Sequence, residues 1–265
     1  MESKLVASDG KTYINVIPSK CMISGFGSTD RADWEVLYVP HKTKNHERWG
    51  LPLMFPNFSS VANDTFTELG IHLPKHGLVT DKEWKEIART DTSITVMFED
   101  NEELLKQFPF KFRLEVTFEV KPKVCVHRYV IKNTGDKVLP CSPGIHPYFS
   151  VPQKEKTNVK INTKEFDCKS YNWENENPDD NIPFTGHLEI VVPTKGTINL
   201  REVSEPTKLF GRMQIWSEKS DAPDHEFICF EPVRLGANGL NNKEGRLNIE
   251  PGKQVEIVHE IEASF

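Results

Sequence analysis

A strict two-residue alternation of apolar and polar side chains is the feature that most constrains how this chain can fold. Apolar residues occupy every second position from Phe112 to Val120, with charged or hydroxyl side chains between them. This period is that of a β-strand with one buried face. Pro122 has no backbone N–H to donate and interrupts the pattern. A second run, from Val124 to Lys132, therefore predicts an antiparallel partner.

Shorter alternating segments recur along the chain, and helical patterns are sparse. The alternating segments lie at residues 94–98, 159–161, 188–192, 213–215, 227–229 and 255–261. Only residues 101–108 and 81–88 are expected to form a helical turn or two. Short strands separated by frequent proline and glycine are typical of an all-β sandwich or barrel. Because no linker or repeat divides the chain, we expect residues 1–265 to form a single domain.

The charge and hydropathy of the chain argue against two classes of partner. The 33 basic and 39 acidic residues give a net charge of −6, which disfavours non-specific binding to nucleic acid. No run of about 18 apolar residues is present, so we expect no membrane-spanning segment. The glycine-rich phosphate loops and the Gly-x-Ser-x-Gly elbow of serine hydrolases are also absent. We therefore expect no nucleotide cofactor.

The cysteines indicate the redox setting. There are five, an odd number, and none forms a Cys-x-x-Cys pair. This pattern argues against a disulfide framework and against a zinc knuckle. The first residues, MESKLVASDGKTY, lack the apolar stretch of a signal peptide. Together these features predict a reduced, cytoplasmic protein.

Two histidines lie in loops that proline and glycine constrain. His76 lies in Leu-Pro-Lys-His-Gly-Leu, and His146 lies in Ser-Pro-Gly-Ile-His-Pro-Tyr-Phe. Pro147 also shifts His146 towards extended backbone geometry. Residues on loops that a rigid scaffold holds are often functional, so both are catalytic candidates. The alternative is that each merely makes a hydrogen bond inside a structured loop.

Glu231 is the carboxylate with the most unusual setting. It ends the apolar segment 227–230 and shares the period-2 phase of Phe227 and Cys229. A carboxylate that enters an apolar face costs several kcal/mol unless it is paired or its pKa rises. A raised pKa is what a general base needs near neutral pH. The alternative is a glutamate at a strand end that turns to solvent.

Taken in order, several segments resemble the aldose 1-epimerase (galactose mutarotase) family. The resemblance spans roughly residues 48–261 and rests on the segments 49–57, 75–78, 108–110, 133–136, 144–149, 214–217, 228–232 and 249–252. It implies a β-supersandwich of antiparallel sheets with a groove for a sugar. The implied reaction interconverts the α and β anomers of an aldose, without a metal or an organic cofactor. By this resemblance Glu231 is the general base, His146 the general acid and His76 a second active-site histidine.

The chemistry suits these residue types. Opening the ring requires a proton to leave the C1 hydroxyl and a proton to reach the ring oxygen, and a carboxylate and an imidazolium can do both. We therefore expect Glu231 to take the O1 proton and His146 to protonate the ring oxygen. His76 is expected to hydrogen-bond the sugar.

The resemblance also suggests residues that bind the sugar. Arg48, which precedes Trp-Gly, and Asn57, which ends the segment 49–57, are the first two candidates. The family also uses an aspartate, for which Asp167, Asp179 and Asp180 are available, and we take Asp167 as the candidate. The leading hypothesis is that the substrate is a free hexose. We expect the protein to be a monomer or a homodimer in solution.

Two alternatives remain for the function. One is a hexose-6-phosphate 1-epimerase, which requires an arginine cluster for the phosphate. Many relatives carry an arginine just after the His-Gly element, and the corresponding stretch here, Leu78-Val79-Thr80, has none, which weakens that option. The other is a carbohydrate-binding protein that kept the fold without efficient catalysis.

Overall fold

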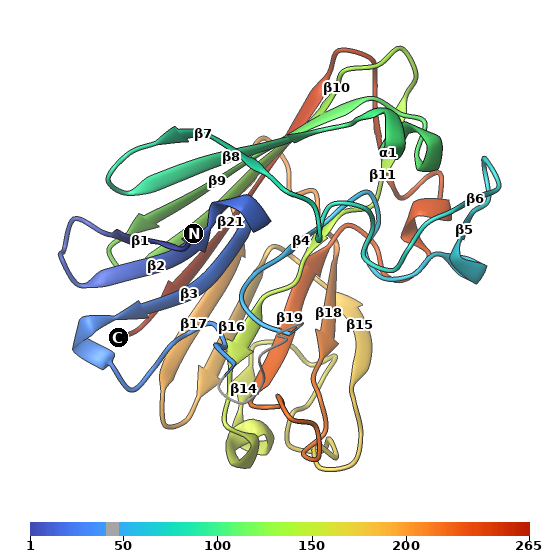
Figure 1. Cartoon of the computed structure of the whole chain (residues 1–265). Coiled ribbons are helices and arrows are strands. Elements are labelled where there is room, and N and C mark those ends of the chain that lie inside the picture. Colours follow the sequence, from blue (N-terminus) through green and yellow to red (C-terminus); the bar gives the residue numbers. More distant parts are fainter. Residues whose placement is uncertain (41–47) are drawn as a thin grey trace.

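The computed structural model describes residues 1–40 and 48–265 and is built almost entirely of antiparallel β-strands (Figure 1). Its largest element is an eight-stranded sheet. In spatial order this sheet contains β14 (Lys160–Ile161), β16 (His187–Val192), β17 (Gly196–Glu202), β21 (Gln254–Ala263), β10 (Val124–Asn133), β9 (Phe112–Lys121), β8 (Ser93–Glu99) and β7 (Lys85–Arg89). The expectation of a β-rich fold made of antiparallel sheets is confirmed.

The hairpin of β9 and β10 lies near the centre of this sheet. Val120 pairs with Cys125 next to the turn, and Phe112 pairs with Asn133 at the far end. Along β9 the apolar residues are buried and the alternate ones are half-buried, as the alternation predicted. The second long neighbour of β10 is the C-terminal strand β21.

A second, six-stranded sheet carries Glu231 on one of its central strands. Its main path is β15 (Asp179–Pro183), β18 (Arg212–Trp216), β19 (Phe227–Val233), β12 (Gly144–Ile145) and β4 (Leu53–Met54), and β13 (Tyr148–Ser150) also pairs with β19. Every residue of β19 is buried, because both faces of this strand are covered. Ile228 and Phe230 point into the main core. Phe227 and Cys229 belong to a smaller cluster with Tyr38 and Tyr148.

Smaller sheets and short helices complete the fold. The N-terminal sheet, β1 (Ser3–Val6), β2 (Thr12–Ile17) and β3 (Met22–Ser28), lies against β9. The pairs β5 (Thr65–Phe66) with β6 (Ile71–His72) and β11 (Leu139–Cys141) with β20 (Leu247–Ile249) are short. The 3-10 helices are Pro18–Lys20, Thr29–Arg31, Ala62–Asp64, Gln153–Asn158 and Gly239–Asn241. The described residues contain no helix of the length and apolar character that a membrane crossing requires.

One of the two helical expectations is confirmed and the other is wrong. Helix α1 spans Glu102–Gln107, and the side chain of Asn101 caps it by accepting hydrogen bonds from the N–H groups of Glu103 and Leu104. The segment 81–88 is not helical. From Lys85 it forms the edge strand β7, whose residues are all exposed. The ladder of hydrogen bonds to β8 thus overrides the local helical pattern.

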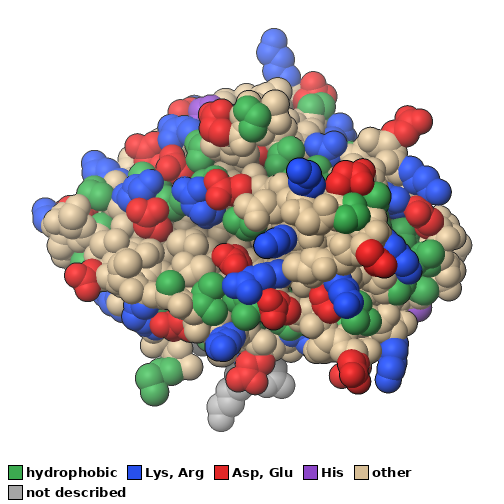
Figure 2. Space-filling model, turned by 90° about the horizontal axis from the view of Figure 1, so that it is seen from above, with side chains coloured by type: hydrophobic (Ala, Val, Ile, Leu, Met, Phe, Trp, Pro, Cys, Tyr) green, Lys and Arg blue, Asp and Glu red, His purple; other side chains and the backbone are tan. Residues whose placement is uncertain are grey.

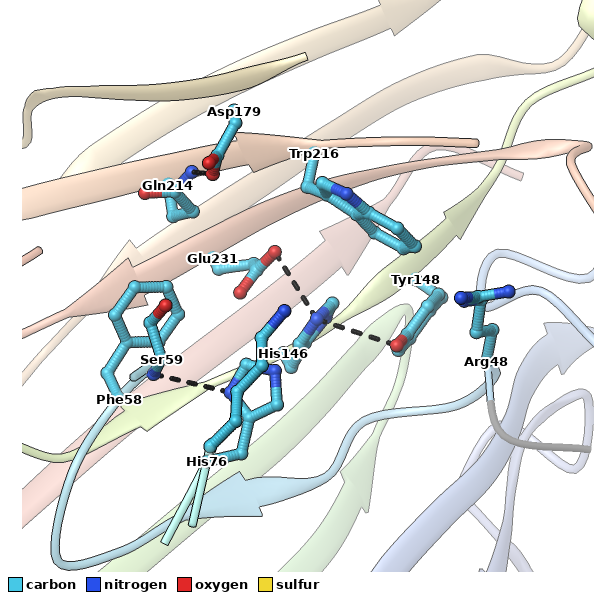
Figure 3. A pocket seen from close by; sticks show the side chains of 11 residues that line it. Arg48, Phe58, Ser59, His76, His146, Tyr148, Asp179, Gln214, Trp216 and Glu231 are labelled. Atoms are coloured by element: carbon cyan, nitrogen blue, oxygen red, sulfur yellow. Dashed lines mark hydrogen bonds and ion pairs between the residues drawn. The ribbon is translucent and has the colours of Figure 1, made fainter. Parts of the chain in front are cut away.

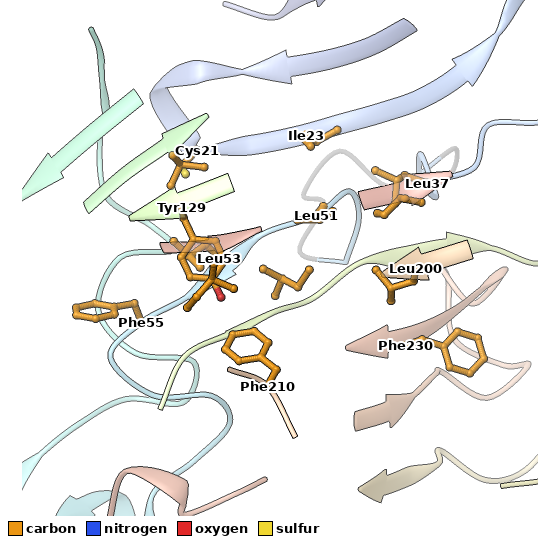
Figure 4. Packing of buried hydrophobic residues seen from close by; sticks show 14 of the residues in the cluster. Cys21, Ile23, Leu37, Leu51, Leu53, Phe55, Tyr129, Leu200, Phe210 and Phe230 are labelled. Carbon is orange, nitrogen blue, oxygen red and sulfur yellow. The ribbon is translucent and has the colours of Figure 1, made fainter. Parts of the chain in front are cut away.

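One large cluster of buried side chains runs from Leu5 to Ala263 and joins the sheets. Figure 4 shows part of it, including Ile23 of the N-terminal sheet, which forms an antiparallel bridge with Leu51. On the face drawn in Figure 2, basic and acidic side chains are interspersed and do not segregate into patches.

Candidate active site

Strand pairing brings Glu231 and His146 together. On one side of β19, Gly144 of β12 pairs with Val233 and Tyr148 of β13 pairs with Cys229. These two pairs place His146, which lies between β12 and β13, directly across from Glu231. Pro147 separates the two short strands, and the backbone N–H of His146 turns away to the carbonyl of Pro52. The imidazole is thereby free to face the carboxylate.

The two side chains contact each other in a buried setting. Nε2 of His146 lies 3.4 Å from Oε1 of Glu231, and the exposed fractions of the two residues are 7% and 1%. The imidazole stacks on the ring of Tyr148, with the ring centroids 4.5 Å apart. Nδ1 of His146 and Oε2 of Glu231 are buried, and neither receives a hydrogen bond from the described residues. Buried polar atoms normally have partners, so these two unsatisfied atoms set the site apart from the rest of the core.

His76 enters the same site from a different loop. Its ring centroid lies 5.5 Å from that of His146 (Figure 3). The backbone of His76 has φ = +65°, and Gly77 follows with φ = +82°. A Cβ at Gly77 would lie 2.1 Å from the carbonyl oxygen of Phe55, so only glycine allows the loop to approach so closely. The N–H of Ser59 donates to Nδ1 of His76 at 3.3 Å. The proton of the neutral ring is therefore on Nε2.

The three residues line one pocket with a volume of about 210 Å³. Its walls are Arg48, Phe58, Ser59, Lys75, His76, His146, Tyr148, Asp179, Gln214, Trp216 and Glu231. Figure 3 shows His146 between Glu231 and Tyr148, with Trp216 and Arg48 towards one end and Gln214 with Asp179 towards the other. The pocket offers aromatic faces together with donors and acceptors, a combination typical of small-molecule sites.

Arg48 lines this pocket, and its role in binding a substrate stays a prediction. Its Nη1 is 2.8 Å from Oε1 of Glu218, and its guanidinium lies 5.4 Å from the centroid of the Trp216 ring. Among the described residues Lys75 makes no hydrogen bond or ion pair, so its ammonium group is the pocket's unpaired cation.

Asn57 and Asp167 do not line the pocket. Asn57 is fully buried, and its amide donates to the carbonyl oxygens of Ser59 and Pro74, at 2.8 and 3.2 Å. It thereby supports the two loops that carry Ser59 and His76. Asp167 lines a separate hollow and accepts a hydrogen bond from the N–H of Lys169.

Asp179 is the aspartate that the fold brings to the pocket. It begins β15 and accepts a hydrogen bond of 2.6 Å from the amide of Gln214 on β18. Gln214 is itself paired with Glu231 across β18 and β19. The sequence contained one signal for these wall residues. Gln214 and Trp216 are two positions apart on β18, so their side chains lie on the same face of the sheet. With the pairing of β18 and β19 known, both would have been placed on the face that carries Glu231.

Burial dominates the acid–base properties of the site. It raises the pKa of Glu231 well above its ordinary value, an effect that the positive charge of Lys75 opposes. It lowers the pKa of His146 well below 6.5, with further lowering by His76 and Lys75. Burial and Lys75 likewise lower the pKa of His76 to about 4. Both imidazoles are therefore neutral near pH 7, in contrast to the imidazolium expected for His146.

One group of side chains within the described residues has the composition of a metal site. The ligand atoms of His146, Cys229 and Glu231 lie within 4.8 Å of one another. Burial raises the pKa of the Cys229 thiol well above its ordinary value, which disfavours the thiolate that a metal ion would need. The expectation of a reaction without a metal or cofactor stays a prediction.

Comparison with known proteins identifies the family. The family model described as aldose 1-epimerase matches residues 60–261. The chain belongs to the aldose 1-epimerase family. Among solved structures, the fold of this epimerase-family chain is similar to that of the Slr1438 protein from Synechocystis. The TM-score is 0.82 and the identity 20%, and the match covers 100% of this chain and 96% of the other.

Two other similar proteins come from lactic acid bacteria. A galactose mutarotase related enzyme from Lactobacillus acidophilus has a TM-score of 0.80 at 20% identity, over 100% of this chain and 98% of the other. The Lactococcus lactis protein LacX is 26% identical over 126 residues, which is 43% of this epimerase-family chain and 41% of LacX. The chain thus matches about two fifths of the length of this curated relative.

Proposed function

We propose that this protein is an aldose 1-epimerase that interconverts the α and β anomers of a free hexose. The observation that carries the proposal is the pairing of a buried carboxyl group with a buried imidazole, 3.4 Å apart, in the wall of a polar pocket. The second imidazole, of His76, faces the same space. An acid and a base so close to one sugar ring suit a reaction that moves two protons between two oxygens of the same molecule.

The proton balance follows from the pKa shifts. Burial raises the pKa of Glu231 and lowers that of His146, and both shifts favour the neutral forms. In the proposed resting state the pair therefore holds one proton, on the carboxyl group. When a sugar binds, transfer of that proton to His146 yields a carboxylate and an imidazolium without changing the net charge. The expected imidazolium thus belongs to the reacting complex and not to the resting site.

Ring opening then regenerates the starting protonation. The Glu231 carboxylate takes the proton from O1, the C1–O5 bond breaks as O1 becomes the aldehyde oxygen, and the His146 imidazolium gives its proton to O5. Rotation about C1–C2 and the reverse steps close the ring on the other face. In this scheme the Nε2–H of His76 donates to a sugar oxygen, because Ser59 occupies its Nδ1.

A neutral sugar fits the charges of the pocket better than a phosphosugar. Among the described residues that line it, Arg48 is already paired with Glu218, and Asp179 adds a negative charge. A phosphate would meet Lys75 as its only unpaired cation there, without the arginine fork that phosphate sites favour.

We also infer the setting in which the protein acts. A core that runs from Leu5 to Ala263 supports a single domain over residues 1–265. The five cysteines are free and buried, which supports a reducing, cytoplasmic location.

Polarimetry tests this proposal. Freshly dissolved α-anomers of several hexoses, and of the matching hexose 6-phosphates, are followed with and without the protein. We expect faster exchange for at least one free hexose, and a smaller effect on its phosphate. Acceleration of the phosphate alone would favour the hexose-6-phosphate alternative. If no sugar responds and sugars still bind, the protein is a carbohydrate-binding member of the family.

A further inference from the structure

Arg48 is held at the wall of the pocket by a glutamate outside it. The side chain of Arg48 is 45% exposed, so packing alone does not fix its direction. Nη1 of Arg48 lies 2.8 Å from Oε1 of Glu218, whose side chain is only 9% exposed. Oε2 of Glu218 accepts a hydrogen bond of 3.0 Å from the amide of Asn177. Because both carboxylate oxygens have partners, Glu218 is a fixed anchor for the guanidinium.

The backbone that carries Glu218 is held by a buried lysine. Lys156 lies in the 3-10 helix Gln153–Asn158, and its side chain is fully buried. Its Nζ donates to Oγ of Ser217 at 2.8 Å and to the carbonyl oxygen of Glu218 at 3.1 Å. Oγ of Ser217 donates in turn to the carbonyl oxygen of Phe227 on β19, at 2.6 Å. These bonds join the segment after β18 both to β19 and to the helix.

Burying Lys156 costs stability, which indicates a role beyond folding. Among the described residues no carboxylate lies within ion-pair distance of its Nζ, and the nearest rings, of Trp173 and Phe227, have centroids 5.7 and 6.0 Å away. Burial lowers the pKa of Lys156 to about 7, which reflects this cost. Lysine is almost never fully buried without a charged partner, and an apolar side chain is often as good for stability. An apolar side chain, however, could not donate to the segment that carries Glu218.

We propose that Glu218 and Lys156 are positioning residues for the sugar: Glu218 orients the guanidinium of Arg48 in the pocket, and Lys156 holds Glu218. The inference rests on the proposed function, because it takes a sugar to be the ligand that Arg48 meets. The guanidinium has several N–H donors, and among the described residues it forms an ion pair only with Glu218. The remaining donors are left for hydroxyl oxygens of a sugar beside Trp216. A guanidinium that is already held in one direction loses less conformational entropy when the sugar binds.

Kinetics of single variants test the two residues. Glu218→Gln removes the charge that holds Arg48, and Lys156→Met removes both bonds to the segment after β18. Each variant should raise KM for a hexose about threefold to tenfold, the usual cost of leaving one long side chain free. Each should leave kcat within about twofold, because the acid–base pair is untouched. An unchanged KM in Glu218→Gln would overturn the proposal.

Two exposed residues nearby provide matched controls. Glu176→Gln removes a carboxylate next to Asn177, and Lys154→Met removes an ammonium group from the helix that carries Lys156. Both controls should leave KM unchanged. If Lys156→Met does not fold, Ser217→Ala removes one of the two acceptors of Lys156 with a smaller change to the core. It should raise KM in the same direction, and an unchanged KM would remove Lys156 from the proposal.

A double-variant cycle shows whether the two residues act through Arg48. In an Arg48→Met background, Glu218→Gln and Lys156→Met should have no further effect on KM, because no guanidinium is left to orient. A merely structural role would raise KM by the same factor in both backgrounds. That outcome would overturn the proposal.

Isothermal titration calorimetry with glucose and galactose separates this proposal from the proposed function. If neither sugar is epimerised but one binds, and Glu218→Gln weakens binding only when Arg48 is present, the positioning role stands and the catalytic proposal fails. If a sugar is epimerised and its KM is the same in Glu218→Gln, the positioning role fails and the proposed function stands. If neither sugar is epimerised or bound, both proposals fail.

Discussion

Nε2 of His146 lies 3.4 Å from Oε1 of Glu231, although one residue is in the loop between β12 and β13 and the other is on β19. Each group would be costly to bury as an isolated charge. Together they can hold one proton and exchange it without a change in net charge. The register on both sides of His146 maintains this relationship, because Gly144 and Tyr148 are each paired with β19.

Glu231→Gln and His146→Asn should each lower kcat by a factor of about 10²–10⁴, the usual contribution of a positioned acid or base. The double variant should lose little more than either single variant, because the two residues act as a unit. Polarimetry on folded protein measures both. The exposed Glu226→Gln is the matched control for the loss of a carboxylate just before β19. A near-normal kcat in either single variant would remove that residue from the proposed mechanism.

The pH dependence should reflect the lowered pKa of His146. A second proton on the Glu231–His146 pair leaves no base, so kcat/KM falls as the pH drops through that pKa. Burial holds the pKa well below 6.5, so the activity should persist below the range in which an ordinary histidine titrates. At high pH the activity should fall when the pair loses its shared proton. An acid limb centred at pH 6.5 or above would contradict this assignment.

Lys75→Met should move this profile to higher pH. The ammonium group of Lys75 lowers the pKa values of Glu231, His146 and His76, so its removal lets all three rise. Lys75→Arg keeps the positive charge, so the variant should largely retain the original pH profile. If Lys75 acted only through its shape and packing, the larger arginine would not restore the profile. The exposed Lys137→Met serves as the control. An unchanged profile in Lys75→Met would show that this charge does not act on the pair.

Asp179→Ala and Asp167→Ala form a matched pair that locates the sugar-binding aspartate. A hydrogen bond between a charged group and a sugar hydroxyl contributes about 1.5–3 kcal/mol. Loss of Asp179 should therefore raise KM roughly 10- to 100-fold. Asp167 lines a different hollow, so its replacement should leave KM unchanged. The opposite outcome would restore Asp167 as the residue that contacts the substrate.

Two histidines outside the site should make the fold sensitive to acid. His127 and His259 are paired across β10 and β21, both are buried, and no described residue hydrogen-bonds their rings. Burial lowers the pKa of His127 to about 3 and that of His259 well below 6.5. Below about pH 6.5 the unfolded chain binds protons that the folded chain does not, so each histidine lowers the free energy of unfolding by about 1.4 kcal/mol per pH unit.

Denaturant titrations at several pH values measure this effect. His127→Phe keeps a ring in the core, and it should flatten the fall in the free energy of unfolding between pH 6.5 and pH 4. His187→Phe, at an exposed position, is the control. An equally steep fall in His127→Phe and in the unaltered protein would show that His127 is not the source.

Much of the fold could be predicted because the signal is local. The alternation of residues 112–120 depends only on which face of a strand is buried, and β9 and β10 formed where it predicted them. Residues 81–88 were assigned incorrectly because an edge strand that is fully exposed leaves no apolar period to detect. Glu231 shares the phase of Phe227 and Cys229, which pointed to a buried setting but left exposure to solvent open. The structure buries it.

The sequence by itself thus determined a β-rich chain and two histidines in constrained loops, because period, proline and glycine act over a few residues. It also gave Glu231 the phase of a buried face, while a glutamate turned to solvent stayed open. Only the tertiary structure decided that Glu231, His146 and His76 meet in one pocket, and that Asp179 lies there while Asp167 and Asn57 do not. Those outcomes depend on which strands pair and in which register. The neutral imidazoles were likewise beyond the sequence, since burial by the whole fold sets their pKa values.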